Sequence, residues 1–308
     1  MNKEHSLEED ACHGTKERPI AIMKFEAGEG TAYPDGFFVQ RHWHRGIEVL
    51  KILEGSYTVE LSLENILLGE GDFCVINSEE LHQIKGNEQK TRHEVIIFQP
   101  EILGFLYEDE FQKSVIEPLV TMQSFIAHVI TKETASYKKI ETVYNKILET
   151  GISREEGWYY DAKIGLLKLV SLLEKDGLLM PPAKVQKAAE KEKIDRYKRM
   201  VSYMEENYMN KVTLKELAVI AGCNPQHLCH FFKEIAGVPP MRHLIRYRIE
   251  KAGELLENST KTVLEISLDC GFDNVSYFIR QFKKITGTTP GEYRKKQGKQ
   301  EEDLLWER

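Results

Sequence analysis

The chain has 308 residues, enough for two domains that each bury a core. Its hydrophobic fraction of 41% and charged fraction of 30% are those of ordinary globular proteins, which excludes a fibrous or low-complexity chain. The net charge of -7 is unevenly distributed, because residues 195–296 carry 17 Lys and Arg against 12 Asp and Glu, whereas residues 1–194 carry 23 against 33. This asymmetry suggests a nucleic-acid-binding module joined to an acidic partner domain.

Three features argue against a secreted or membrane protein. Residues 1–10 are polar and acidic, so we expect no signal peptide. No apolar run approaches the roughly 20 residues that cross a bilayer. The cysteines are scattered and contain no Cys-x-x-Cys pair, which fits a reducing cytosol: Cys12, Cys74, Cys223, Cys229 and Cys270. We therefore expect a cytoplasmic protein with no membrane partner.

Residues 1–18 are expected to be flexible, and a β-rich region follows over residues 19–100. There, short apolar runs alternate with Gly, Asn and acidic turns, which is typical of strands in a sandwich or small barrel. The expected strands cover residues 20–25, 37–43, 47–53, 57–63, 72–76 and 94–98.

Residues 101–180 change to apolar spacings of three and four, which predicts helices over residues 114–132, 137–150 and 155–175. Their apolar stripes exceed what one face of a barrel needs, so we expect this region to pair two subunits into a homodimer. A charged linker is expected over residues 181–194, and a frayed tail over residues 297–308.

Residues 195–296 contain one structural unit twice. The segment Phe232–Pro240 reappears 50 residues later as Phe282–Pro290. The segment before it, Leu217–Gly222, matches Ile266–Gly271. Each copy consists of a short amphipathic helix, a glycine turn and a second amphipathic helix, which is the pattern of a DNA-binding helix-turn-helix. A helix predicted over residues 241–257 would hold the two recognition helices about one DNA turn, ~34 Å, apart.

The second helix of each copy has a polar outward face. On the first it carries Gln226, Cys229, His230 and Lys233, and on the second Ser276, Ile279, Arg280 and Lys283. Arg280 suits guanine, Gln226 suits adenine, and Ile279 suits a thymine methyl group. Other basic side chains suit backbone phosphates: Lys233, Lys283, Lys284 and Arg294. A helical bundle with a merely solvated basic face is the alternative, and the duplication favours DNA binding.

Residues 197–296 resemble the arabinose-operon regulator (AraC/XylS) family of bacterial transcription factors. In the first copy the resemblance rests on Leu217-Ala218, Gly222, Phe232-Lys233, Gly237 and Pro240. In the second it rests on Gly271-Phe272, Tyr277-Phe278, Phe282-Lys283-Lys284, Gly287, Thr289-Pro290 and Tyr293-Arg294. The resemblance implies promoter DNA and RNA polymerase as partners, and activation of transcription as the commoner outcome. The family often has a small polar residue at the position of Ile279, so no base preference carries over there.

A second pattern lies in the strand region, where Gly36-x5-His42-x-His44-x3-Glu48-x6-Gly55 is followed by Gly71-x10-His82. Histidines two apart on a strand share a face, and with Glu48 and His82 they make a donor set for a divalent metal. The first spacing resembles the first motif of the cupin superfamily, whereas Asn77 and Glu79 depart from the second motif.

Three interpretations of these histidines remain open. They form a metal site, a metal-free pocket for a small effector such as a sugar, or a hydrogen-bonded structural cluster. The departures at Asn77 and Glu79 favour the effector pocket. Phe38 and Phe73 are candidates for its walls, with a role in the core as the alternative.

The sequence thus predicts an α+β chain with an N-terminal cupin-like β-barrel, appended helices and a C-terminal all-α double helix-turn-helix domain. We expect a sequence-specific transcriptional regulator that responds to a small-molecule effector. No P-loop, nucleophile elbow or dinucleotide-binding fingerprint occurs, so no enzyme is expected. The alternative is a cupin metalloenzyme, or a metal sensor, fused to a DNA-binding module.

Overall fold

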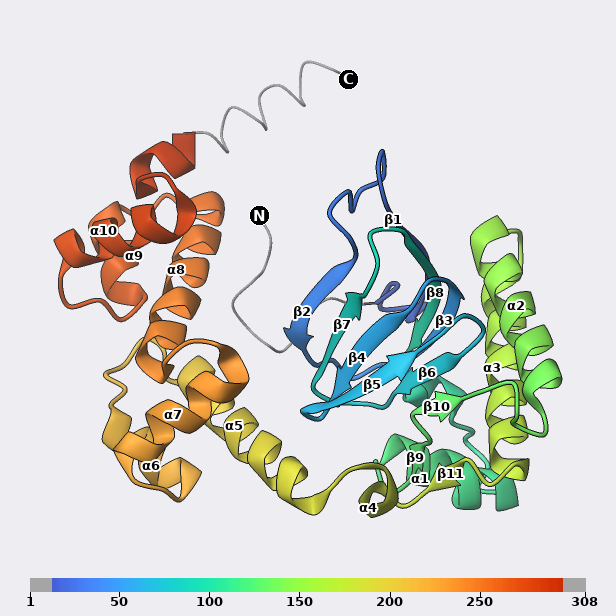
Figure 1. Ribbon diagram of the computed structural model, residues 1–308. Coiled ribbons are helices and arrows are strands. Elements are labelled where there is room, and N and C mark those ends of the chain that lie inside the picture. Colours follow the sequence, from blue (N-terminus) through green and yellow to red (C-terminus); the bar gives the residue numbers. More distant parts are fainter. Residues whose placement is uncertain (1–12, 296–308) are drawn as a thin grey trace. The chain divides into compact units, whose positions relative to one another are not determined.

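The computed structural model describes residues 13–295, which form two compact units that divide between Lys191 and Glu192 (Figure 1). The N-terminal unit combines antiparallel sheets with helices, and the C-terminal unit consists of helices. Across the described residues, no helix is both long and apolar enough to cross a membrane. Flexible ends are expected over residues 1–18 and 297–308, of which residues 1–12 and 297–308 lie outside the described residues.

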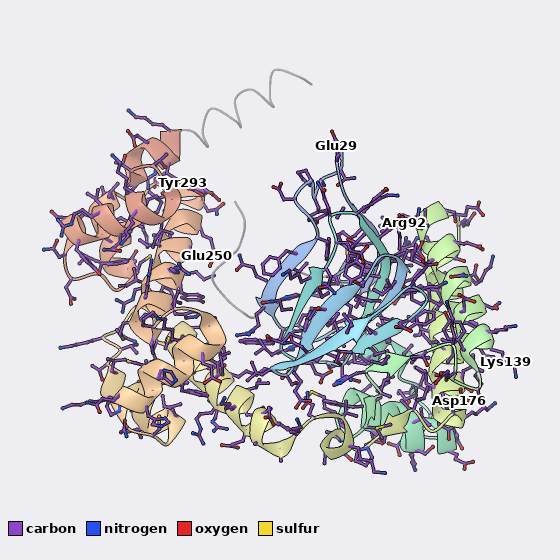
Figure 2. All side chains as sticks on the ribbon, viewed as in Figure 1. Glu29, Arg92, Lys139, Asp176, Glu250 and Tyr293 are labelled. Atoms are coloured by element: carbon purple, nitrogen blue, oxygen red, sulfur yellow. The ribbon has the colours of Figure 1, made fainter. Side chains whose placement is uncertain are left out.

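Two antiparallel sheets form the body of the N-terminal unit. The first contains, in spatial order, β1 (Ile20–Ala27), β8 (Thr91–Phe98), β3 (Ile47–Glu54), β6 (Phe73–Ile76) and β10 (Val129–Ile130). The second contains β2 (Phe38–His42), β7 (His82–Gly86), β4 (Tyr57–Leu61) and β5 (Glu64–Leu68). Side chains fill the space between the sheets (Figure 2), and the apolar core there includes Leu50, Ile52, Val59, Ile84 and Val95.

Strand alternation decides which residues of β3 face this core. Leu50 and Ile52 lie in the core between the sheets, whereas Val49 belongs to the core on the other face. The same alternation places Glu48 on the inner face. The structure therefore carries a carboxylate into the space between the sheets at the start of β3.

Helices α2 (Tyr137–Ser153) and α3 (Trp158–Lys175) cover the outer face of the first sheet (Figure 1). Tyr144 donates its hydroxyl to Val49 O at 3.2 Å. Smaller elements complete the unit: a 3-10 helix over Pro100–Leu103, a π-helix over Gln112–Ile116, α1 (Glu117–Val120), β9 (Phe125–Ile126), β11 (Leu179–Met180) and α4 (Pro182–Val185).

The prediction of one helix over residues 114–132 is wrong. The helix ends at Val120, and residues 125–130 contribute two short strands. The reason is a side chain far away in the sequence. Asn77 Oδ1 accepts from Ile126 N at 2.7 Å, and Asn77 Nδ2 donates to Ile126 O at 3.0 Å. The buried amide thus bonds one edge of β9, while β11 pairs with the other edge, and together they hold this segment extended.

The C-terminal unit repeats its local structure as well as its sequence. Its helices are α5 (Ala188–Glu206), α6 (Leu214–Ala221), α7 (Pro225–Ala236), α8 (Pro240–Asn258), α9 (Val263–Asp269) and α10 (Val275–Thr286). Capping boxes begin α6 and α9, through Thr213 with Glu216 and Thr262 with Glu265. Asparagine N-caps begin α7 and α10.

Aromatic residues form the core of the second repeat, including Phe272, Phe278, Phe282 and Tyr293. Tyr293, labelled in Figure 2, donates its hydroxyl to Glu257 at 2.6 Å. This bond ties the segment after α10 to the end of α8.

Candidate functional site

Helices α7 and α10 are the second helices of the two repeats and carry the predicted DNA-reading residues. On α7, Gln226, His230 and Lys233 are exposed and Cys229 is half-buried. On α10, Ser276, Arg280, Lys283 and Lys284 are exposed. Ile279 is half-buried and packs against the core of the second repeat, which leaves less of it for a thymine methyl group. Each helix therefore presents a continuous polar face.

Arg294 differs from the other predicted phosphate-binding residues. Its Nε donates to Leu256 O at 3.3 Å, and its Nη2 donates to Lys261 O at 2.6 Å. The guanidinium therefore fastens the turn between α8 and α9.

The prediction from sequence also missed two residues. His227 and Tyr277 are exposed in the first turns of α7 and α10, where a recognition helix contacts base edges. The sequence contained a signal for both residues, because they occupy equivalent positions in the two repeats.

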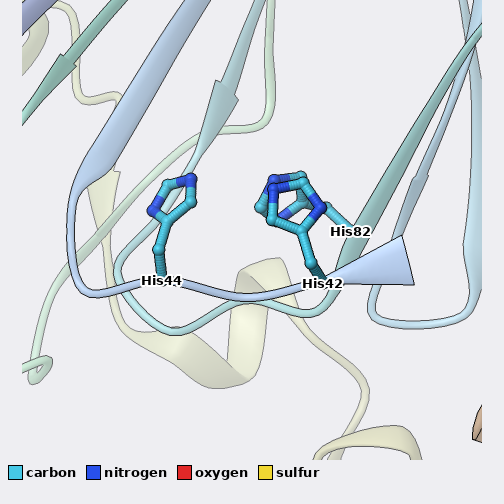
Figure 3. A group of neighbouring side chains, drawn as sticks. All are labelled: His42, His44 and His82. Atoms are coloured by element: carbon cyan, nitrogen blue, oxygen red, sulfur yellow. The ribbon is translucent and has the colours of Figure 1, made fainter. Parts of the chain in front are cut away.

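The predicted histidines converge in the N-terminal unit. His42 ends β2, His82 begins β7 opposite it, and His44 lies in the loop after β2 (Figure 3). One ring nitrogen from each lies within 4.8 Å of the others. Glu48 approaches them from β3, with its Oε2 3.1 Å from His44 Nε2 and 3.7 Å from His82 Nε2. The four residues thus form one cluster, hereafter the histidine cluster.

Backbone carbonyls fix how these rings are protonated. His42 Nδ1 lies 2.8 Å from Gln40 O, His44 Nδ1 3.0 Å from Gly46 O, and His82 Nδ1 2.8 Å from Glu80 O. A carbonyl can only accept, so each Nδ1 is the donor. Each neutral ring then keeps its lone pair on Nε2. A metal-binding histidine is usually oriented in this way, because its other ring nitrogen donates a hydrogen bond to a carbonyl or carboxylate.

Three atoms of the histidine cluster are placed to bind a cation. His82 Nε2 is fully buried and has no hydrogen-bond partner. His44 Nε2 and Glu48 Oε2 are 3.1 Å apart, so they share either a proton or a cation. A divalent metal would satisfy all three atoms, and imidazole with carboxylate is a ligand set for zinc, iron, nickel or copper. The donor set therefore fits a metal ion.

The charges within the cluster reinforce this fit. Burial acts to raise the pKa of Glu48, but the hydrogen bond from His44 and the neighbouring imidazoles outweigh it and hold the pKa at about 2. Burial, together with His42 and His44, lowers the pKa of His82 well below its usual value of 6.5. A carboxylate and a neutral imidazole therefore face each other near neutral pH, which suits a cation or a hydrogen-bond-donating ligand.

The two predicted wall residues lie elsewhere. Phe73 packs against Tyr137 and Tyr144 of α2 on the outer face of the sheet, so its role is in the core. Phe38 is 49% exposed and pairs with Lys85, at the opposite end of the β2–β7 pair from His42 and His82. There it lines a surface pocket of about 500 Å³. Neither phenylalanine joins the histidine cluster.

Sequence patterns did not reveal a second group in the same interior. His93 Nδ1 on β8 lies 2.8 Å from the Tyr57 hydroxyl, within hydrogen-bond distance. Its ring packs against those of Phe25 and Phe37, with centroids 5.0 and 4.4 Å away. Burial lowers the pKa of His93 to about 4, which keeps the ring neutral. The four residues come from separate strands and loops, so only the sheet pairing brings them together.

Comparison with known proteins gives matches to both units. The family model of an AraC-like ligand binding domain matches residues 27–130, and that of a helix-turn-helix domain matches residues 217–296. The uncharacterized HTH-type transcriptional regulator YdeC of Bacillus subtilis is 26% identical over 293 residues, covering 95% of this chain and 97% of YdeC. The HTH-type transcriptional activator RhaS of Klebsiella pneumoniae is 21% identical over 275 residues, covering 88% and 94%.

Among solved structures, the C-terminal domain of the two-component response regulator yesN from Fusobacterium nucleatum is 34% identical. The match covers 31% of this chain and 93% of that domain, with a TM-score of 0.30. Together the matches define a DNA-binding transcriptional regulator with an N-terminal ligand-binding domain. The chain therefore carries an AraC-like ligand binding domain and a helix-turn-helix domain, and its relatives are transcriptional regulators. The fold class and regulatory role predicted from the sequence are confirmed.

Proposed function

We propose that this regulator binds promoter DNA through both recognition helices and changes transcription when the histidine cluster binds an effector. The observation that supports DNA reading by both repeats is the exposure of equivalent polar faces on α7 and α10. Arg280 and Gln226 read bases, and Lys233, Lys283 and Lys284 contact phosphates. Arg294 stabilises the domain instead, because two carbonyls already bind its guanidinium.

The regulator acts in the cytoplasm as an activator that contacts RNA polymerase, and it works as a homodimer. Support for a dimer comes from the outer face of the α2–α3 pair. Ile152, Tyr160 and Ile164 are 50%, 70% and 64% exposed there, and the last two stand one helical turn apart. Burying these side chains against a second copy removes apolar surface from water.

The effector is a small polar molecule, with sugars as the first class to test, and the histidine cluster recognises it through His42, His44, Glu48 and His82. The cluster serves sensing rather than catalysis. Incubation with candidate substrates and Fe(II), Mn(II) or Zn(II) tests this point, since turnover would favour the metalloenzyme instead.

A metal sensor is the second candidate, and the unpartnered Nε2 of His82 favours it. His42, His44 and His82 would hold the ion, with Glu48 beside them. When bound, the ion would supply positive charge that balances the buried Glu48 carboxylate. Metal analysis of protein purified without added metal distinguishes the candidates. If the protein contains stoichiometric metal and loses regulation when the metal is chelated, it senses metal rather than a polar metabolite.

A reporter assay tests the proposed function. His44→Ala is expected to abolish the response to the effector while leaving basal DNA binding intact. Gln123→Ala, at an exposed position in the same unit, is the control and should respond normally. An unchanged response in His44→Ala would contradict the assignment of the effector site.

A further inference from the structure

A buried carboxylate, that of Glu80, lies directly beside the histidine cluster and is not one of the residues proposed to bind the ligand. Glu80 is 2% exposed and accepts from several donors. Asn77 N and Asn77 Nδ2 donate at 2.8 and 3.1 Å, and His128 Nε2 lies 2.9 and 3.0 Å from its two oxygens. The remaining donor is Gln186 Nε2, at 2.5 Å. A buried carboxylate needs such partners, so losing one of them is costly.

Gln186 occupies a special place in the chain, because it follows α4 and precedes α5. Its Nε2 also lies 3.0 Å from Ser62 Oγ, in the turn between β4 and β5. The next residue, Lys187, pairs with Glu64 of β5. Two successive linker residues are therefore fastened to the sheet.

The same short segment touches the histidine cluster. Glu80 O accepts from His82 Nδ1 at 2.8 Å, and Glu79 N donates to His44 O at 2.8 Å. The segment 79–82 thus includes His82 and bonds to His44, and its Glu80 carboxylate binds Gln186. The bond from His82 Nδ1 to Glu80 O therefore connects the position of the His82 ring to the backbone that carries the Glu80 carboxylate.

Helix α5 begins two residues after Gln186 and continues to Glu206. Its later turns pack against the first recognition helix, with Tyr197 4.8 Å from the ring of Phe232 and Arg196 6.0 Å from that of Phe231. The helix that supports α7 therefore starts next to the point where the linker is fastened.

We propose that the contact between Glu80 and Gln186 is a latch that couples the histidine cluster to α5 and hence to DNA binding. Ligand binding at His82 tightens the latch and orders the start of α5, and loss of the ligand loosens it. The inference rests on the proposed function, because it assigns a route between the effector site and the DNA-binding unit.

The test compares full-length Gln186→Glu with the wild-type chain and with Gln123→Glu. The substitution at Gln186 sets one carboxylate against another, whereas Gln123→Glu makes the same change at an exposed site of the same unit. Without any ligand, hydrogen exchange at residues 186–191 should rise about tenfold in Gln186→Glu only, the factor expected for losing a hydrogen bond to a charged group. Exchange in α3 should stay unchanged, which shows that the unit remains folded.

DNA affinity is measured on a sequence selected by the wild-type chain from random DNA. Gln186→Glu should change that affinity, and Gln123→Glu should not. Unchanged exchange at residues 186–191, or raised exchange with unchanged affinity, would overturn the latch. His82→Ala should also raise exchange at residues 186–191, and no increase there would overturn its link to the cluster. If the wild-type chain selects no DNA sequence, the proposed function fails, while the exchange data still report on the latch.

Discussion

The two turn glycines of the repeats should respond very differently to the same substitution. Gly222 and Gly271 both have positive φ angles, 62° and 74°. A Cβ on Gly222 meets no atom within 4 Å. A Cβ on Gly271 would collide with Tyr208 O and lie 2.9 Å from Arg248 Nη2. The same guanidinium donates to Tyr208 O and Asn210 O at 2.8 and 2.7 Å.

These contacts set the magnitudes. Gly222→Ala forces an alanine into the left-handed conformation and has no other cost, so the loss of folding free energy should be about 1 kcal/mol. Gly271→Ala adds the same term, plus about 1–3 kcal/mol for a contact that forces the backbone to move. Disturbing the Arg248 hydrogen bonds adds about 1 kcal/mol or more. We therefore expect a loss of about 3 kcal/mol or more at Gly271.

Hydrogen exchange of the full-length chain in increasing urea measures each unit separately. Relative to the wild type, the urea midpoint of exchange should fall more for α9 and α10 peptides in Gly271→Ala than for α6 and α7 peptides in Gly222→Ala. Peptides from α3 should match the wild type in both variants. Equal losses in the two variants, or a larger loss for Gly222→Ala, would refute the reasoning from the contacts of Gly271.

Three further predictions concern the two sites. Arg280→Ala should weaken specific DNA binding by about 1–3 kcal/mol and relax the preference at one base pair, whereas Lys283→Ala should weaken all sequences about equally; anisotropy titrations on variant sites check both. Burial lowers the pKa of His93 in the folded protein to about 4, whereas the unfolded ring takes up a proton below pH 6.5. The free energy of unfolding should therefore decrease as the pH is lowered from 6.5 to about 4. His93→Gln should remove about 1.4 kcal/mol per pH unit of that fall, and an unchanged pH profile of urea denaturation would contradict it. If a metal is bound, Glu48→Gln should release it at lower chelator concentration, as measured by metal analysis.

Much of the fold followed from local patterns. Short apolar runs bounded by turn residues predicted β1, β2, β3, β4, β6 and β8, and apolar spacings of three and four predicted α2, α3 and α8. The strand β7 was missed because its run is short and rich in polar residues, and β5 was missed because it follows β4 after only two residues. The strands after α1 depend on the side chain of Asn77, which lies about 50 residues away in sequence, and no local pattern records that contact.

The candidate site shows the same division. Spacing alone predicted that His42, His44, Glu48 and His82 converge. Strand pairing places His42 opposite His82, whereas His44 reaches the cluster from the loop after β2. Phe38 and Phe73 were assigned to the pocket by residue type alone, without knowledge of the strand register. The pairing places Phe38 at the end of β2 away from His42, and Phe73 on the outer face of the first sheet. Glu80 escaped notice since its partners His128 and Gln186 are distant in sequence.

Selection of bound sequences from random DNA by the full-length chain tests the central claim most directly. We expect a motif of two blocks about one helical turn, ~10 base pairs, apart, and an affinity that falls steeply as salt rises. Arg280→Ala should lose the preference for one base pair in a single block. Enrichment of no sequence, or a motif that Arg280→Ala leaves unchanged, would contradict sequence-specific reading by both repeats.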